Sequence, residues 1–205
     1  MAEQDTAIHS LARGFRFVAA LLVAVGLVMT NAVAAHANFS GANGKTGCSG
    51  GSPVNMADGG THNFNYVSLN SAVQSAVAWS RTYNYDSTDV NTGYDSTLDP
   101  TTDVIVRNQD YTTYCGFSWH PGSTVGLTTC DSLSGGFKCE SHTVRFDISY
   151  FNAANQSQER GLACHEIGHS LGLTHRDAET GCMETYLTYP TYLTDHDEAH
   201  LNANY

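Results

Sequence analysis

Two histidines four residues apart, His165 and His169, are the residues of this chain best suited to chemistry. On an α-helix this spacing places both imidazoles on one face, one turn apart. Glu166 lies beside the first histidine and can reach the same side. Gly172 stands where a left-handed cap would end such a helix. The chain can then turn back and bring His175 to the two helical imidazoles.

Three neutral imidazoles with one open coordination position make a catalytic zinc site, whereas structural zinc sites use four protein ligands. The sequence therefore predicts one catalytic Zn²⁺ held by His165, His169 and His175. Glu166 would be the general base for water at the metal. The alternative is a surface helix that carries histidines without binding a metal.

The spacing of these residues resembles the metzincin signature of zinc endopeptidases, His-Glu-x-x-His-x-x-Gly-x-x-His. Metzincins also carry a methionine turn downstream, and Met183 lies where that turn is expected. The chain is most similar to small secreted bacterial metzincins of the matrixin-like or reprolysin-like type. The resemblance implies an α+β fold: a single domain with a mixed sheet, a long zinc-binding helix and a small C-terminal helical subdomain. It also implies that Met183 forms an apolar floor under the ligands.

The resemblance implies a zinc-dependent endopeptidase that acts on protein or peptide substrates. Glu166 would take a proton from the attacking water and deliver it to the leaving amine. The competing hypothesis is a non-enzymatic zinc-binding interaction module that keeps the metzincin frame. A site that no longer catalyses often lacks the glutamate that serves as base. Glu166 is present, which favours the enzyme over the interaction module.

Three polar residues lie close to the expected site. Asp177 follows His175 by two residues and could orient a ligand histidine by accepting its second N–H, or it could simply be solvated. Tyr186 comes three residues after Met183, whereas some metzincins place a tyrosine two residues after the methionine. Glu184 as third ligand would suit a different zinc-protease architecture, and its position beside Met183 disfavours that role.

The six cysteines all follow the N-terminal segment, and an even count in an exported chain predicts three disulfides. Cys164 directly precedes His165, and Cys182 directly precedes Met183. A methionine turn under the zinc, as the resemblance implies, would bring these two thiols together and predicts Cys164–Cys182.

The other four cysteines are less constrained by the sequence. Cys130 and Cys139 could close a Gly-rich loop, which leaves Cys48 to pair with Cys115. A zinc–thiolate site is the rival interpretation, but the sequence has no Cys-x-x-Cys pair. Cys48 also lacks the Pro-Arg-Cys-Gly context of the inhibitory thiol in matrixin propeptides.

The first 37 residues have the features of a secretory signal peptide. Arg13 and Arg16 precede an unbroken apolar run, Phe17–Met29, and residues 35–37 form a small-residue cleavage site, Ala-His-Ala. The alternative is a membrane anchor, although this run is shorter than the roughly 20 residues that a span needs. We expect a secreted, extracellular protein without stable membrane association after signal cleavage.

Composition divides the remaining chain in two. Residues 38–60 are rich in Gly, Ser and Asn and predict a loosely tied N-terminal arm or short pro-segment, and residues 61–205 form the predicted catalytic domain. The net charge of −11 makes nucleic acid and anionic membranes poor partners. Structural Ca²⁺ could bind among four acidic residues whose spacing differs from an EF-hand loop, although exposed acidic loops are the plainer explanation: Asp86, Asp89, Asp95 and Asp99.

Periodicity predicts the elements that position the site. Strands are expected at 62–67, 103–107 and 143–151, the last with alternating apolar residues from Val144 to Tyr150. A first helix over 69–83 would be capped by Ser68 or Asn70, the zinc helix by Asn152 or Asn155, and a short final helix by Asp195.

Overall fold

The computed structural model describes residues 39–48, 54–176, 180–185 and 190–205. The predicted signal peptide, residues 1–37, lies outside the described residues. A compact unit spans Ala37–Tyr205. Within the described ranges, no helix has the length and apolar character needed to cross a membrane.

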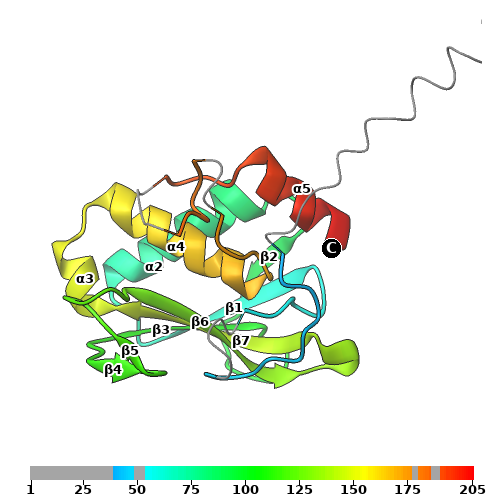
Figure 1. The fold of residues 1–205 in the computed structure, drawn as a ribbon, viewed down its shortest axis with the longest axis horizontal. Helices are drawn as coiled ribbons and strands as arrows, with labels where there is room; N and C mark the ends of the chain where they lie inside the picture. The colour runs from blue at the N-terminus through cyan, green and yellow to red at the C-terminus, as the bar shows by residue number, and fades with distance from the viewer. Residues whose placement is uncertain (1–38, 49–53, 177–179, 186–189) are drawn as a thin grey trace, which may run out of the picture. The chain divides into compact units, whose positions relative to one another are not determined.

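A five-stranded mixed sheet forms one layer of this unit, with strand order β2-β1-β3-β7-β6 (Figure 1). Neighbouring strands are parallel except for β6, which runs antiparallel to β7 at the edge of the sheet. A small antiparallel pair, β4 and β5, lies in the connection between β3 and β6. The strands are β1 (Thr61–Val67), β2 (Asn91–Tyr94), β3 (Val104–Gln109), β4 (Thr113–Tyr114), β5 (Phe117–Ser118), β6 (Gly126–Leu133) and β7 (Cys139–Asp147).

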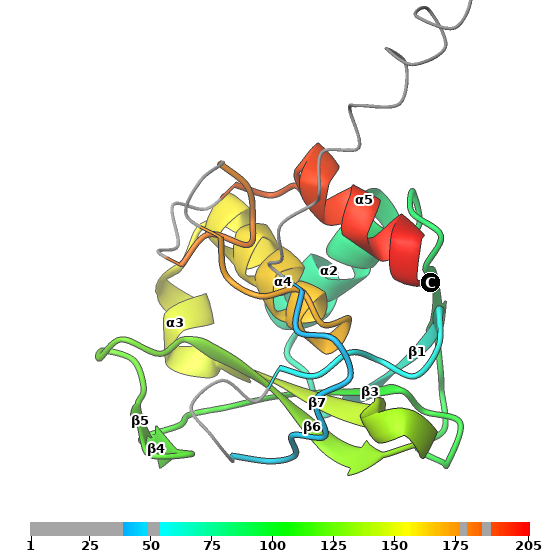
Figure 2. The ribbon, with the colours of Figure 1, turned by 45° about the vertical axis from the view of Figure 1, so that its right-hand side comes forward.

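Helices α2 and α4 form a second layer over one face of the sheet, and α5 lies on their side that faces away from the sheet (Figures 1 and 2). This arrangement of a mixed sheet and packed helices is the α+β fold expected from the sequence. The helical elements are α2 (Ser71–Ser80), a π-helical turn η1 (Arg81–Tyr85), a 3₁₀ turn η2 (Gly135–Phe137), α3 (Ile148–Ala153), α4 (Gln156–Ser170) and α5 (Asp195–Asn204).

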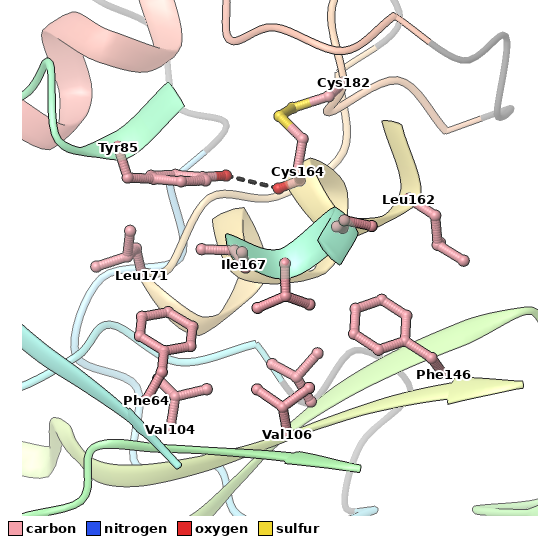
Figure 3. Close-up of a cluster of buried hydrophobic side chains, with 14 of the residues drawn as sticks. Phe64, Tyr85, Val104, Val106, Phe146, Leu162, Cys164, Ile167, Leu171 and Cys182 are labelled. Carbon is pink, nitrogen blue, oxygen red and sulfur yellow. Dashed lines mark hydrogen bonds between the residues drawn. A yellow bond between two sulfur atoms is a disulfide. The ribbon is translucent and has the colours of Figure 1, made fainter. Parts of the chain in front are cut away.

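The core lies between α4 and the sheet (Figure 3). Alternate residues of β3 point into it, so that Val104 and Val106 are fully buried. Phe64 and Phe146 reach the same layer from β1 and β7, and Ile167 meets them from α4. Each such side chain contributes about 1.5–3 kcal/mol to folding when it leaves water. The site helix is therefore anchored by its apolar face.

The third predicted strand lies four residues earlier in the chain than the predicted range, 143–151, because β7 spans Cys139–Asp147. β7 ends at Asp147, and the next residues form α3 instead of continuing to Phe151. The Asp147 carboxylate accepts hydrogen bonds from the backbone N–H groups of Ser149 and Tyr150, at 2.8 and 3.2 Å. This N-cap stabilises the start of a helix and ends the strand.

Helix caps decide where the two later helices begin. Asn155 caps α4 in a capping box with Gln158, so Asn155 and not Asn152 has this role. Thr194 caps α5 in a second box with Asp197. The predicted cap at Asp195 is one residue late, because the Thr194 hydroxyl and not the Asp195 carboxylate accepts the Asp197 N–H.

The described residues of the N-terminal arm are hydrogen-bonded to the domain more extensively than the sequence suggests. Met56 is buried, and its carbonyl accepts from the Cys139 N–H at 2.8 Å. At the start of the arm, the Ser40 N–H donates to the Gly172 carbonyl at 2.8 Å. The arm thus contacts both the sheet and the turn that follows α4.

Candidate metal centre

His165 and His169 occupy successive turns of α4 and are 5 % and 7 % exposed. Their ring centroids are 4.5 Å apart with an interplanar angle of 84°. Their Nε2 atoms lie 3.0 Å apart. The helical spacing therefore brings both nitrogens to one point, as the sequence predicts.

A glycine turn after α4 brings the third histidine to the same point. Gly172 has a φ of +92°, and the Leu173 N–H donates to the Gly168 carbonyl at 3.0 Å. A Cβ at Gly172 would lie 2.9 Å from the Cα of Met56, so the arm closes off this position to larger residues. After the turn, His175 Nε2 lies 3.1 Å from the Nε2 of His165 and 3.2 Å from that of His169.

Backbone carbonyls hold the two helical imidazoles in one tautomer. His165 Nδ1 donates to the Cys182 carbonyl, and His169 Nδ1 donates to the Leu173 carbonyl, both at 2.7 Å. An imidazole that donates from Nδ1 carries its lone pair on Nε2. Lone pairs that converge in this way repel one another unless they share a cation.

The donor set fits zinc. Nitrogens at about 2.0–2.1 Å from a tetrahedral zinc would lie about 3.3 Å from one another, close to the separations observed here. Burial, reinforced by the neighbouring His175, lowers the pKa of His165 to about 4. Burial and the adjacent histidines also lower the pKa of His169. Both rings are therefore neutral at neutral pH, the form that binds a metal.

Glu166 points from α4 toward the edge strand β6 and is 4 % exposed. The Thr128 hydroxyl lies 2.8 Å from both Oε2 and the backbone oxygen of Glu166 and donates to them. A Cβ at Gly126 would lie 2.5 Å from Oε1 of Glu166, so glycine leaves the room that this carboxylate occupies. Burial raises the pKa of Glu166 to about 8, and the hydrogen bond from Thr128 acts in the opposite direction.

Sequence reasoning did not identify Thr128 and Gly126. Nothing in the local pattern of β6 distinguishes them, because their role depends on the contact of this strand with α4. A Gly-x-Thr spacing places both residues on one face of a strand. This shared face is the only feature of the local sequence that could have pointed to their common role.

Met183 lies against the middle of the site helix and is 1 % exposed. A Cβ at Gly168 would overlap the Met183 sulfur, so the glycine between the two helical histidines lets the methionine approach. The Cys164–Cys182 disulfide joins the helix to this segment, with 5.9 Å between the Cα atoms (Figure 3). On the other side, the buried Tyr85 hydroxyl donates to the Cys164 carbonyl at 2.6 Å.

The structure contains two further disulfides, Cys48–Cys115 and Cys130–Cys139, and all three bonds join the pairs expected from the sequence. His142 lies close enough to the sulfurs of Cys130 and Cys139 to suggest a metal cluster. The disulfide occupies both sulfurs, which leaves no thiolates for the rival zinc–thiolate interpretation.

Two residues weighed near the site, Asp177 and Tyr186, lie outside the described residues. Glu184 is described, and its N–H donates to the Gly181 carbonyl at 3.3 Å. It does not belong to the histidine cluster found in the described part of the chain.

Two of the acidic residues considered for calcium accept hydrogen bonds from hydroxyl groups of nearby threonines in the same loop. Asp95 Oδ2 accepts from the Thr102 hydroxyl at 2.5 Å, and Asp99 Oδ1 accepts from the Thr101 hydroxyl at 2.7 Å. No potential metal cluster among the described residues includes Asp86, Asp89, Asp95 or Asp99. Calcium binding is therefore unsupported.

The mixed sheet, the long helix and the three convergent histidines define a metzincin-type metalloprotease. The family model for matrixin peptidases matches residues 72–205, and the chain belongs to the matrixin family. A comparison with curated proteins finds no significant match. Family membership supports metalloendopeptidase activity in general and implies zinc as the metal.

Proposed function

We propose that this protein is a secreted endopeptidase that holds one zinc ion through His165, His169 and His175 and hydrolyses peptide bonds with Glu166 as general base. The observation that carries the proposal is the convergence of the three Nε2 atoms within 3.0–3.2 Å. The buried Glu166 carboxylate is adjacent in sequence to the first of these ligands.

Zinc, when bound, acts as a Lewis acid toward the scissile carbonyl and lowers the pKa of water toward neutrality. Glu166 would take a proton from the attacking water as its oxygen bonds to the scissile carbonyl carbon, hold that proton on its carboxylate and deliver it to the leaving nitrogen as the C–N bond breaks. The Thr128 hydroxyl orients the carboxylate during this cycle. Burial raises the pKa of Glu166 to about 8, which helps the carboxyl hold the proton between the two transfers. A cation bound beside it would favour the ionised form that accepts the proton.

Secretion is the second part of the proposal. Three disulfides form readily only in an oxidising compartment. The apolar N-terminal segment, with its small-residue cleavage site, has the features of an export signal. Protein or peptide chains outside the cell are then the substrates, with no stable contact to nucleic acid or to the membrane.

Cleavage of casein by the purified protein starting at residue 38 tests this function. We expect cleavage that a chelator stops and added zinc restores. Glu166→Ala should keep its zinc and lose about 10²–10⁴-fold in turnover, since only proton transfer is removed. His175→Ala should lose most of the zinc as well. Glu159→Ala, on the first turn of the same helix, is the matched control and should retain both properties.

The alternative is a zinc-binding interaction module without catalysis. Full zinc occupancy without cleavage of casein or of a quenched peptide library would support that reading. Near-normal cleavage by Glu166→Ala would overturn the role of the base.

A further inference from the structure

α5 carries a second histidine pair whose geometry matches the pair on the site helix. His196 and His200 are four residues apart, with ring centroids 4.5 Å apart and an interplanar angle of 85°. The corresponding values for His165 and His169 are 4.5 Å and 84°. The Nε2 atoms lie 3.1 Å apart in the α5 pair and 3.0 Å apart in the α4 pair.

Packing fixes one ring of this pair and leaves the other accessible. His200 is 9 % exposed and stacks on Phe39, with ring centroids 5.9 Å apart and nearly parallel planes. His196 is half-buried and can be reached from solution. A first ligand that packing holds in place lowers the entropic cost of capturing an ion.

The surrounding charges act in both directions. Burial, followed by the neighbouring His196, lowers the pKa of His200, which favours the neutral imidazole. Asp197 lies close enough to affect His200 electrostatically and favours a cation there, whereas Arg176 opposes one. His200 is therefore biased toward the neutral form that binds a metal, and the charges around it include one that favours a cation and one that opposes it.

We propose that His196 and His200 form a second metal site, a two-histidine chelate on α5 for a divalent transition ion such as Zn²⁺, Ni²⁺ or Cu²⁺. Imidazole nitrogen is a preferred ligand of these ions. Among the described residues, no third His, Cys, Asp or Glu joins this pair in a cluster. Water would complete the coordination, so the α5 site should bind more weakly than the three-histidine centre.

The competing explanation is a hydrogen bond between the rings, with one Nε2–H donating to the other Nε2. That bond needs no metal and gives a similar separation. The two explanations differ in what the protein takes up from solution, and this difference can be measured directly.

Metal uptake by the full mature chain tests the site. The zinc-loaded protein is dialysed against Ni²⁺, and total bound metal is measured by elemental analysis. We expect one more equivalent in the wild type than in His196→Gln. His120→Gln is the matched control, since His120 is a half-buried histidine whose Nδ1 contacts a serine hydroxyl. The control should take up as much metal as the wild type.

Thermal unfolding supplies a second readout. Ni²⁺ should raise the melting temperature of the zinc-loaded wild type and of His120→Gln, and this shift should be lost in His196→Gln. Equal metal uptake by the wild type and His196→Gln would overturn the proposal. A single equivalent in the wild type that disappears in His196→Gln would support the α5 site while contradicting the three-histidine centre.

Discussion

At the scale of single residues, Thr128 controls the position of the Glu166 carboxylate. Thr128→Val keeps the shape of the side chain and removes the donated hydrogen bond. We expect kcat to fall about 10- to 150-fold with little change in KM, because a hydrogen bond to a charged group contributes about 1.5–3 kcal/mol and each 1.36 kcal/mol is tenfold in rate. Steady-state kinetics on a quenched peptide measures this change.

The conservative variant separates positioning from folding. Thr128→Ser retains a hydroxyl and should keep most of the wild-type kcat. Equal losses in Thr128→Ser and Thr128→Val would mean that packing of the β6 edge, and not the hydrogen bond, matters. Gly126→Ala should lose more than either, because its Cβ would displace the carboxylate.

A second residue-scale prediction concerns His62, which is fully buried beside His142. Burial, reinforced by His142, lowers the pKa of His62 to about 3, and its Nδ1 has no hydrogen-bond partner. At pH values below the ordinary histidine pKa of about 6.5, His62 is protonated in the unfolded chain but stays neutral in the folded chain. Stability contributed by the neutral ring is therefore present above pH 6.5 and lost as the pH falls toward 3.

Replacement of His62 by leucine removes this loss. Between about pH 6 and pH 4 the free energy of unfolding of the wild type should fall more steeply than that of His62→Leu, by about 1.4 kcal/mol per pH unit. In His62→Leu, Ser170 loses its contact with the imidazole but keeps the hydrogen bond that its hydroxyl donates to the Ile167 carbonyl. Denaturant unfolding at several pH values measures both slopes, and identical slopes would contradict the prediction.

At the scale of elements, the Cys164–Cys182 disulfide ties α4 to the segment that carries Met183. This disulfide closes a loop of 18 residues. It contributes about 3 kcal/mol to the free energy of unfolding, because it restricts the unfolded chain. The Cys182 carbonyl also accepts the Nδ1 hydrogen of His165. Loss of the bond should therefore affect both stability and the orientation of a proposed ligand.

The double variant Cys164→Ala with Cys182→Ala should unfold at lower temperature and release zinc faster to a chelator. The matched control is Cys130→Ala with Cys139→Ala, which opens a loop of 9 residues worth about 2.5 kcal/mol. The control should lose stability but keep its zinc. Equal zinc loss in both variants would show that the effect is global destabilisation.

At the scale of the whole molecule, the N-terminal arm braces the turn that carries His175. Phe39 forms a β-bridge with Leu173, and Ser40 donates to the Gly172 carbonyl. A chain shortened to begin at Lys45 loses both contacts. We expect it to fold and to bind zinc less tightly, as measured by competition with a chromogenic chelator.

Ser40→Ala is the control for this deletion, because it keeps the backbone N–H that contacts Gly172. It should bind zinc as the full arm does. Wild-type zinc affinity in the shortened chain would show that the turn is held by Gly172 and Met56 without the first residues of the arm.

The spacing within the chain was sufficient to predict the histidine cluster. The four-residue interval between His165 and His169 and the glycine before His175 are local features, and helix geometry converts them directly into position. The apolar runs likewise predicted the strands and the main helices. Strand ends and caps were predicted less well, because the Asp147 carboxylate caps α3 and so turns the last residues of the predicted strand 143–151 into a helix.

Only the tertiary structure revealed the surroundings of Glu166 and the docking of the arm. Thr128 and Gly126 lie about forty positions before Glu166 in the chain and meet it through packing of β6 against α4. Such contacts cannot be predicted from the local sequence, because they depend on how separate elements bury their apolar faces together. For the same reason, the sequence analysis did not single out the histidines of α5, and only the folded chain showed that His200 stacks on Phe39 while His196 is half-buried.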